Sequence, residues 1–120
     1  MKPRQFEECD RQEGHPTDGE SAQLVLRVPV DMFWLEGHFP GDPILPAVVQ
    51  LAEAMRLIRQ RWPDLEGLGK IRRAKFRRTI HPADQLTLQL KRMDGGRRVV
   101  FEYSREGEIC SSGKLEFRSR

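Results

Sequence analysis

The sequence is poor in cysteine and has no long apolar run. Its two cysteines, Cys9 and Cys110, lie far apart and have no Cys or His neighbour at metal-ligand spacing, so neither a disulfide framework nor a metal site is indicated. No apolar stretch approaches the roughly 20 residues that cross a bilayer. The N-terminus lacks the basic-then-apolar order of a signal peptide. We therefore expect a cytoplasmic protein with no membrane span.

The composition is that of one folded domain. Hydrophobic residues make up 38% and charged residues 32% of the 120 residues, which excludes a disordered or fibrous chain. A chain of this length suits a single core. Residues 1–21 are polar and lack a sustained apolar period, so we expect a flexible tail there and one domain over residues 22–120.

The apolar pattern predicts a strand followed by a long helix. Residues 23–30 are apolar and β-branched, which is typical of a strand. Pro46 suits the first turn of a helix and Pro63 stops the apolar repeat, so a helix is expected over residues 46–61. The apolar residues that recur at helical spacing there are Val48, Leu51, Ala52, Met55 and Ile58.

After a turn expected around Gly67, alternating apolar residues predict four more strands. Ile71 breaks the alternation of this region, which predicts a bulge near residues 72–73. Turn sequences at residues 94–96 and 105–107 predict an antiparallel meander of the last three strands. The expected fold class is α+β, an antiparallel sheet wrapped around one long helix, and pairing as a homodimer or higher even oligomer would stabilise so small a domain.

One segment carries a specific motif. Residues 37–51 read Gly-His-Phe-Pro-Gly-Asp-Pro-Ile-Leu-Pro-Ala-Val-Val-Gln-Leu. This loop with three spaced prolines, followed by an apolar helix, resembles the active-site segment of beta-hydroxyacyl-acyl-carrier-protein dehydratases. The start of the helix is most similar to the variant found with aryl-polyene biosynthesis. The resemblance extends over about residues 33–117 and implies a hotdog fold.

The resemblance implies a reaction and several site residues. His38 would be the general base that removes the proton beside the thioester carbonyl, and water would leave to give a trans-2-enoyl product. The amides of Ala47 and Val48 at the helix start would stabilise the negative charge that develops on the carbonyl oxygen. Phe39 and Leu51 are further candidates for substrate binding. No metal or organic cofactor is implied.

The sequence departs from the family fourteen residues after His38. The family carries an acid, or in some variants a histidine, at this position, and this chain has Ala52. Glu53 is adjacent, but one residue turns a helical side chain by about 100°. Glu53 would therefore share a face with Val49 and Leu57. It is either the displaced catalytic acid or an ordinary helix carboxylate paired with a nearby arginine.

Basic residues gather after the helix. Six of the nine residues from 70 to 78 are Lys or Arg, although the net charge of the chain is only +3. Acyl carrier proteins are acidic and present their acyl chain on a phosphopantetheine arm, so we expect such a carrier to bind here. The expected contact residues are Arg72, Arg73, Arg77 and Arg78. No nucleic-acid-binding motif accompanies these charges, and nucleic acid is not the expected partner.

Three functions from different classes remain open at this stage. The first is a (3R)-hydroxyacyl-carrier-protein dehydratase, a hydro-lyase that uses His38. The second is a non-catalytic hotdog subunit that binds acyl carrier protein and has lost the acid at Ala52. The third is a hotdog thioesterase, because one fold hosts all three activities. The motif around His38 favours the first and Ala52 favours the second.

Overall fold

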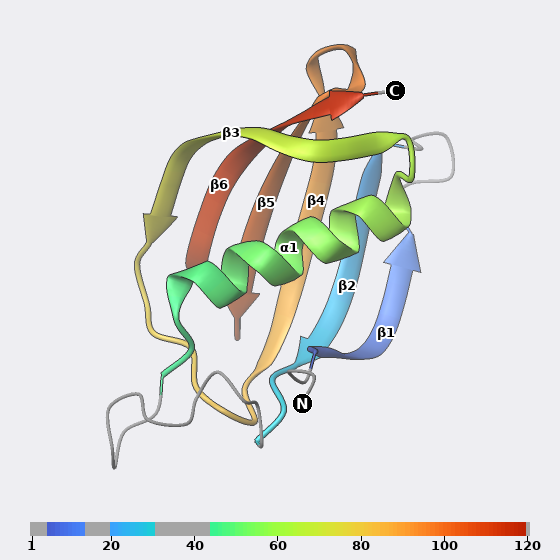
Figure 1. Ribbon diagram of the computed structural model, residues 1–120. Coiled ribbons are helices and arrows are strands. Elements are labelled where there is room, and N and C mark those ends of the chain that lie inside the picture. Colours follow the sequence, from blue (N-terminus) through green and yellow to red (C-terminus); the bar gives the residue numbers. More distant parts are fainter. Residues whose placement is uncertain (1–4, 14–19, 31–43, 120) are drawn as a thin grey trace.

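The computed structural model describes residues 5–13, 20–30 and 44–119. They form one long helix and one six-stranded antiparallel sheet (Figure 1). The elements in chain order are β1 (Glu7–Glu13), β2 (Ser21–Arg27), α1 (Ala47–Arg61), β3 (Leu65–Phe76), β4 (Gln85–Met93), the 3-10 turn η2 (Asp94–Gly96), β5 (Arg98–Arg105) and β6 (Glu108–Ser119). The strand order across the sheet is β1-β2-β4-β5-β6-β3. The predicted meander of the last three strands is confirmed.

The core lies between the sheet and α1, which crosses one face of the sheet (Figure 1). Strand registers place buried side chains in rows that run across the strands. One row joins Leu24, Leu88, Tyr103 and Ser111 of β2, β4, β5 and β6. All four are buried, because alternate residues of each strand face the helix. This arrangement is the predicted α+β packing of a sheet around one helix.

Helix α1 begins directly after Pro46, one residue later than predicted, and ends at the predicted Arg61. Its buried residues are Val49, Gln50, Glu53, Ala54, Leu57 and Ile58. The stripe predicted from apolar spacing therefore coincides with the buried face only at Ile58, since Val48 and Ala52 are exposed and Leu51 and Met55 are only partly buried. The buried face includes two polar residues, Gln50 and Glu53, and an apolar pattern could not include them. Neither α1 nor any other described helix is long and apolar enough to cross a membrane.

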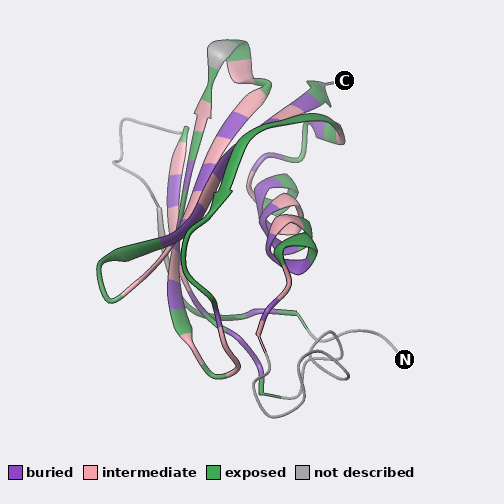
Figure 2. Ribbon diagram, turned by 90° about the vertical axis from the view of Figure 1, so that its left-hand side faces the viewer, coloured by how far each residue is buried: buried purple, intermediate pink, exposed green. Residues whose placement is uncertain are grey.

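Strand β3 forms one edge of the sheet and is exposed over most of its length (Figure 2). Its pairing with β6 shifts register between Arg72 and Lys75, and Arg73 has a φ of 51°. The bulge predicted at residues 72–73 is thus confirmed. The expected turn around Gly67 is wrong, because β3 begins at Leu65 and continues through Gly67.

The prediction that residues 1–21 form a flexible tail is wrong for the described residues 5–13. Strand β1 pairs antiparallel with β2 along its length and forms the second edge of the sheet. Phe6 lies just before β1 and is buried against Tyr103, with 6.0 Å between the ring centroids. The polar composition of β1 concealed it, because an edge strand that lies outside the main core needs few apolar residues.

Candidate active site

The start of α1 presents backbone donors with no partner among the described residues. Pro46 precedes the helix and has no N–H, and its carbonyl accepts hydrogen bonds from the amides of Val49 and Gln50. The amides of Ala47 and Val48 therefore remain available. No acidic side chain lies in the first turn and no side chain caps it. Among the described residues, no acidic side chain of the first turn and no capping side chain offsets the positive end of the helix dipole, and such a helix end suits an oxyanion.

A buried polar network fixes this helix end to the sheet. The Gln50 side chain, only 4% exposed, donates from Nε2 to the Leu45 carbonyl at 3.2 Å and accepts at Oε1 from the Ser111 hydroxyl at 2.7 Å. The Tyr103 hydroxyl donates to the Gln50 carbonyl at 2.8 Å. Burial raises the pKa of Tyr103 well above its ordinary value, and the negative charge of Glu53 adds to the effect. Tyr103 is therefore a neutral donor.

Glu53 is 8% exposed and lies on the face of α1 that meets the sheet. Arg56 donates to Oε2 at 3.0 Å and to Oε1 at 3.1 Å, and the Phe6 amide donates to Oε1 at 2.7 Å. Both oxygens are therefore engaged. The pairing with Arg56 is the one expected of an ordinary helix carboxylate.

The other face of α1 carries the remaining predicted helix residues. Val48 is 67% exposed, Ala47 and Ala52 are also exposed, and Leu51 is partly buried. This face is apolar, and it turns away from the face that contains Glu53. The sequence prediction that Glu53 and Ala52 point in different directions is confirmed. His38 and Phe39 belong to residues 31–43, which lie outside the described residues.

The four predicted carrier-contact arginines differ in their ion pairing. Arg72 pairs with Glu116 at 2.9 Å and Arg78 pairs with Glu108 at 2.5 Å. Within residues 5–13, 20–30 and 44–119, neither Arg73 nor Arg77 has an ion-pair partner. Arg77 also lines a shallow surface hollow with Arg78, Gly107, Glu108 and Ile109. Lys70 and Lys75 of β3 likewise have no ion pair among the described residues, so the unpaired positive charge on β3 and just beyond it comprises these two lysines together with Arg73 and Arg77.

Two pairs of polar residues in this region could not be found from the sequence. Polar side chains such as Gln50 and Ser111 are usually exposed, and only the fold brings these two together across the core. Asp84 and Arg105 are 21 residues apart and pair at 2.7 Å. The sequence signal for the buried polar contact is Gln50 itself, a single polar residue among the apolar residues at the start of the helix.

Comparison with known proteins identifies the family. The family model described as ApeI-like, ApeI dehydratase, matches residues 13–114. This chain belongs to the ApeI-like dehydratase family. The predicted resemblance to hydroxyacyl-carrier-protein dehydratases is confirmed, and the ApeI-like match agrees with the predicted aryl-polyene variant.

Individual relatives agree with this assignment. The chain is 32% identical over 109 residues to the 3-hydroxyacyl-[acyl-carrier-protein] dehydratase FabZ of Lactobacillus helveticus. The matched region covers 82% of this chain and 74% of that protein. An uncharacterized protein from Erwinia carotovora subsp. atroseptica has a crystal structure that superposes with a TM-score of 0.80 at 31% identity, over 97% of this chain and 98% of that one.

A solved complex shares the fold at lower identity. The dehydratase heterocomplex ApeI:P from Xenorhabdus doucetiae gives a TM-score of 0.77 at 24% identity, with full coverage of both chains. With this neighbour and the sheet and helix described above, the ApeI-like chain has the predicted hotdog fold.

Proposed function

We propose that this ApeI-like protein removes water from (3R)-3-hydroxyacyl thioesters carried on an acyl carrier protein and releases trans-2-enoyl thioesters. The observation that carries the proposal is the start of α1, where the amides of Ala47 and Val48 have no partner among the described residues and which follows the histidine-proline motif in the sequence. A FabZ relative named for this reaction is similar over 82% of the chain. The substrate arrives on the carrier, so the reaction needs no further cofactor.

In this proposal His38 accepts the proton from the carbon beside the thioester carbonyl. The electron pair of that bond moves toward the carbonyl oxygen, where the amides of Ala47 and Val48 stabilise the negative charge. Collapse of this enolate forms the carbon–carbon double bond and expels the hydroxyl from the next carbon. The hydroxyl leaves as water once an acid protonates it. Phe39 and Leu51 would contact the acyl chain.

We propose that Glu53 is not this acid. Its carboxylate is held by Arg56 and the Phe6 amide on the sheet side of α1, whereas Ala47, Val48 and Ala52 occupy the exposed side. Glu53 thus fastens the residue that precedes β1 to the helix. The acid would come from outside the described residues of this subunit, and a second subunit could supply it across the exposed face of α1.

A second candidate function follows from Ala52. A subunit without its own acid could bind acyl carrier protein and act only with a partner. The neighbour from Xenorhabdus doucetiae is itself a dehydratase heterocomplex. Strand β3 has an open edge, and its exposed Ile71 and Phe76 offer apolar surface for another subunit, either a second copy or a different chain.

We further propose that Arg73 and Arg77 make the main electrostatic contacts with the carrier protein. Arg72 and Arg78 are already paired with glutamates, so their charge is partly cancelled. Charge reversal at Arg73 or Arg77 should weaken carrier binding and its salt dependence more than the same change at Arg72.

One assay separates the candidates. The protein is mixed with a (3R)-3-hydroxyacyl carrier protein and the mass of the carrier is followed for wild type, His38→Ala and Glu53→Gln. A dehydratase removes one water, a thioesterase removes the whole acyl group, and a non-catalytic subunit changes nothing. We expect water loss that His38→Ala abolishes and Glu53→Gln retains. Loss of activity in a well-folded Glu53→Gln protein would instead place the acid at Glu53.

A further inference from the structure

One turn of the chain holds both described ends of the segment that carries the catalytic motif. Residues 79–84, here called the 79–84 turn, form the last part of the connection between β3 and β4. Val28 donates to the Asp84 carbonyl at 2.9 Å and accepts from the Ala83 amide at 2.8 Å. Leu45 donates to the Ile80 carbonyl at 2.7 Å. In the sequence, residues 31–43, which include His38, lie between Val30 and Ile44 and outside the described residues.

The 79–84 turn contains one residue in an energetically unfavourable backbone conformation. Ala83 has a φ of 71°, in the left-handed region that residues with a Cβ seldom adopt. This conformation accompanies the reciprocal pair of hydrogen bonds with Val28. A strained residue persists only where its surroundings fix it, so the turn must be held from elsewhere.

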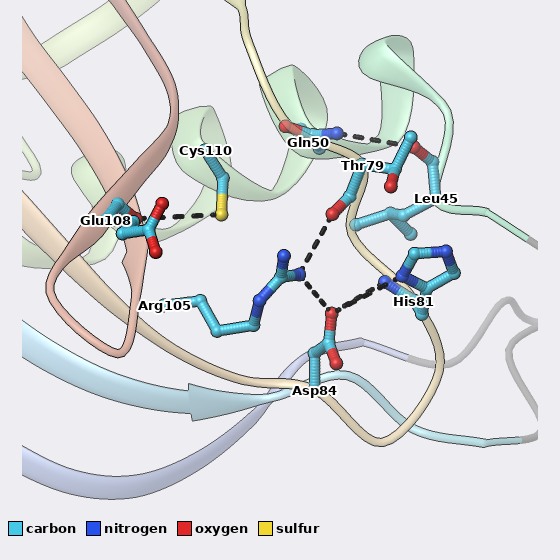
Figure 3. A network of polar contacts seen from close by, with 8 residues as sticks. All are labelled: Leu45, Gln50, Thr79, His81, Asp84, Arg105, Glu108 and Cys110. Carbon is cyan, nitrogen blue, oxygen red and sulfur yellow. Dashed lines mark hydrogen bonds and ion pairs between the residues drawn. The ribbon is translucent and has the colours of Figure 1, made fainter.

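The Asp84 carboxylate provides that hold, as Figure 3 shows. Oδ2 accepts from the His81 amide at 2.8 Å and from Arg105 Nη1 at 2.7 Å. The same Arg105 nitrogen donates to the Thr79 carbonyl at 2.9 Å, so β5 binds the turn at its first and last residues. Charge-assisted hydrogen bonds of this length are stronger than neutral ones. The Asp84 and Arg105 side chains are 21% and 28% exposed, which limits screening by solvent.

The contacts of Asp84 and Arg105 with the 79–84 turn, here called the clamp, also affect the start of α1. Leu45 is fixed at its amide by Ile80 and at its carbonyl by Gln50, and Pro46 and the free amide of Ala47 follow it directly. A displacement of the turn would therefore move the anchors of both the histidine segment and the oxyanion donors. Displacements of about 1 Å can reduce a rate by roughly 100-fold.

We propose that Asp84 and Arg105 are positioning residues for dehydration, which act by holding the 79–84 turn against Val28 and Leu45. This inference rests on the proposed function, and neither side chain is assigned a contact with substrate.

The chain offers a matched control at the opposite end of the helix. Asp64 forms an ion pair with Arg92 next to the C-terminus of α1, remote from Val28 and Leu45. Asp84→Ala and Asp64→Ala each remove one carboxylate that is paired with one arginine. Asp84→Asn is the conservative variant, because its amide oxygen still accepts from the His81 amide.

The experiment measures kcat, KM for the acyl carrier protein, Tm and amide hydrogen exchange at Val28 and Leu45. We expect Asp84→Ala to lower kcat roughly 10- to 100-fold with little change in KM, Asp84→Asn to fall between it and wild type, and Asp64→Ala to keep the wild-type kcat. Exchange at Val28 and Leu45 should accelerate only in the Asp84 variants. Equal losses of kcat in Asp84→Ala and Asp64→Ala, or an unchanged kcat in Asp84→Ala, would overturn the proposal.

The exchange measurement separates this inference from the proposed reaction. If the wild-type protein does not convert the substrate, the proposed function fails. Amide exchange at Val28 and Leu45 then tests by itself whether Asp84 holds these residues in place. Wild-type protection of both amides in Asp84→Ala would show that Asp84 does not hold them.

Discussion

At the scale of single residues, Tyr103 connects the sheet to the start of α1. It is the one tyrosine of the chain and is fully buried. Its hydroxyl donates to Gln50, and its ring packs edge-on against Phe6 and Phe101. Burial keeps the hydroxyl neutral, because a phenolate could neither be solvated there nor donate this hydrogen bond.

The raised pKa of Tyr103 predicts how the stability and the tyrosinate absorbance of the protein change at alkaline pH. The unfolded chain ionises this tyrosine above a pKa of about 10, whereas the folded protein keeps its proton to a higher pH. Stability from this group is therefore full below pH 10 and decreases as the pH rises toward the folded-state pKa. Tyrosinate absorbance in the folded protein should stay low past pH 10 and then appear together with unfolding.

Tyr103→Phe provides the control for this titration. It should lower the free energy of unfolding at neutral pH by about 1 kcal/mol, the usual contribution of one hydrogen bond. It should also reduce the loss of stability above pH 10. A tyrosinate signal with a midpoint near 10 in the folded wild type would contradict the buried, neutral Tyr103.

Gly113 is a residue whose missing side chain is required by packing. A Cβ at this position of β6 would lie 2.7 Å from Cε2 of the buried Phe101 ring and 3.3 Å from the Ala74 backbone. Gly113→Ala should therefore destabilise the fold by about 1–3 kcal/mol, as overpacking does. The comparison is Gly69→Ala in β3, where the nearest atom is the Glu116 carbonyl oxygen at 3.4 Å. Denaturant unfolding of the two variants measures the difference, and equal stabilities would contradict the packing described.

At the scale of elements, β1 is an integral edge of the sheet that is anchored through Phe6. Phe6 is 4% exposed and its amide donates to Glu53. Phe6→Ala should lower the free energy of unfolding by about 3–5 kcal/mol, the range for removing a buried aromatic ring. The exposed Cys9→Ala in β1 should have little effect. Thermal unfolding checks both, and a wild-type Tm in Phe6→Ala would mean that β1 is not anchored in this way.

The elements also explain which sequence predictions succeeded. The bulge near Arg73 and the turn at Gly107 depend on local backbone preference, and both appear where the sequence places them. The buried face of α1 depends on tertiary partners. Gln50 and Glu53 are buried only because Ser111, Leu45, Phe6 and Arg56 satisfy their polar atoms. An apolar period has no means of finding such residues.

In the candidate site too, features set by local sequence could be predicted, and features set by tertiary contacts could not. Its motif and its helix start are contiguous in sequence, so the resemblance and a helix that begins next to Pro46 could be predicted. The partners of Glu53 and the pairing of Asp84 with Arg105 join residues distant in the chain. Only the fold brings them together.

At the scale of the whole molecule, one face of α1 and the outer edge of β3 have no partner among the described residues. Val48 is an exposed apolar residue on the helix, and Ile71 is an exposed apolar residue among the basic residues of β3. The acid that dehydration requires has no place at Ala52. These features support the proposal that a second subunit covers α1 and completes the site.

The mass of the acyl carrier protein shows directly whether this protein dehydrates a carrier-bound acyl chain. Wild-type protein is incubated with a carrier that bears a (3R)-3-hydroxyacyl chain, beside His38→Ala and the distant Asp64→Ala. We predict that the carrier loses one water with wild type and Asp64→Ala but not with His38→Ala. An unchanged carrier mass with folded, carrier-binding wild type, or the same water loss with His38→Ala, would contradict the account.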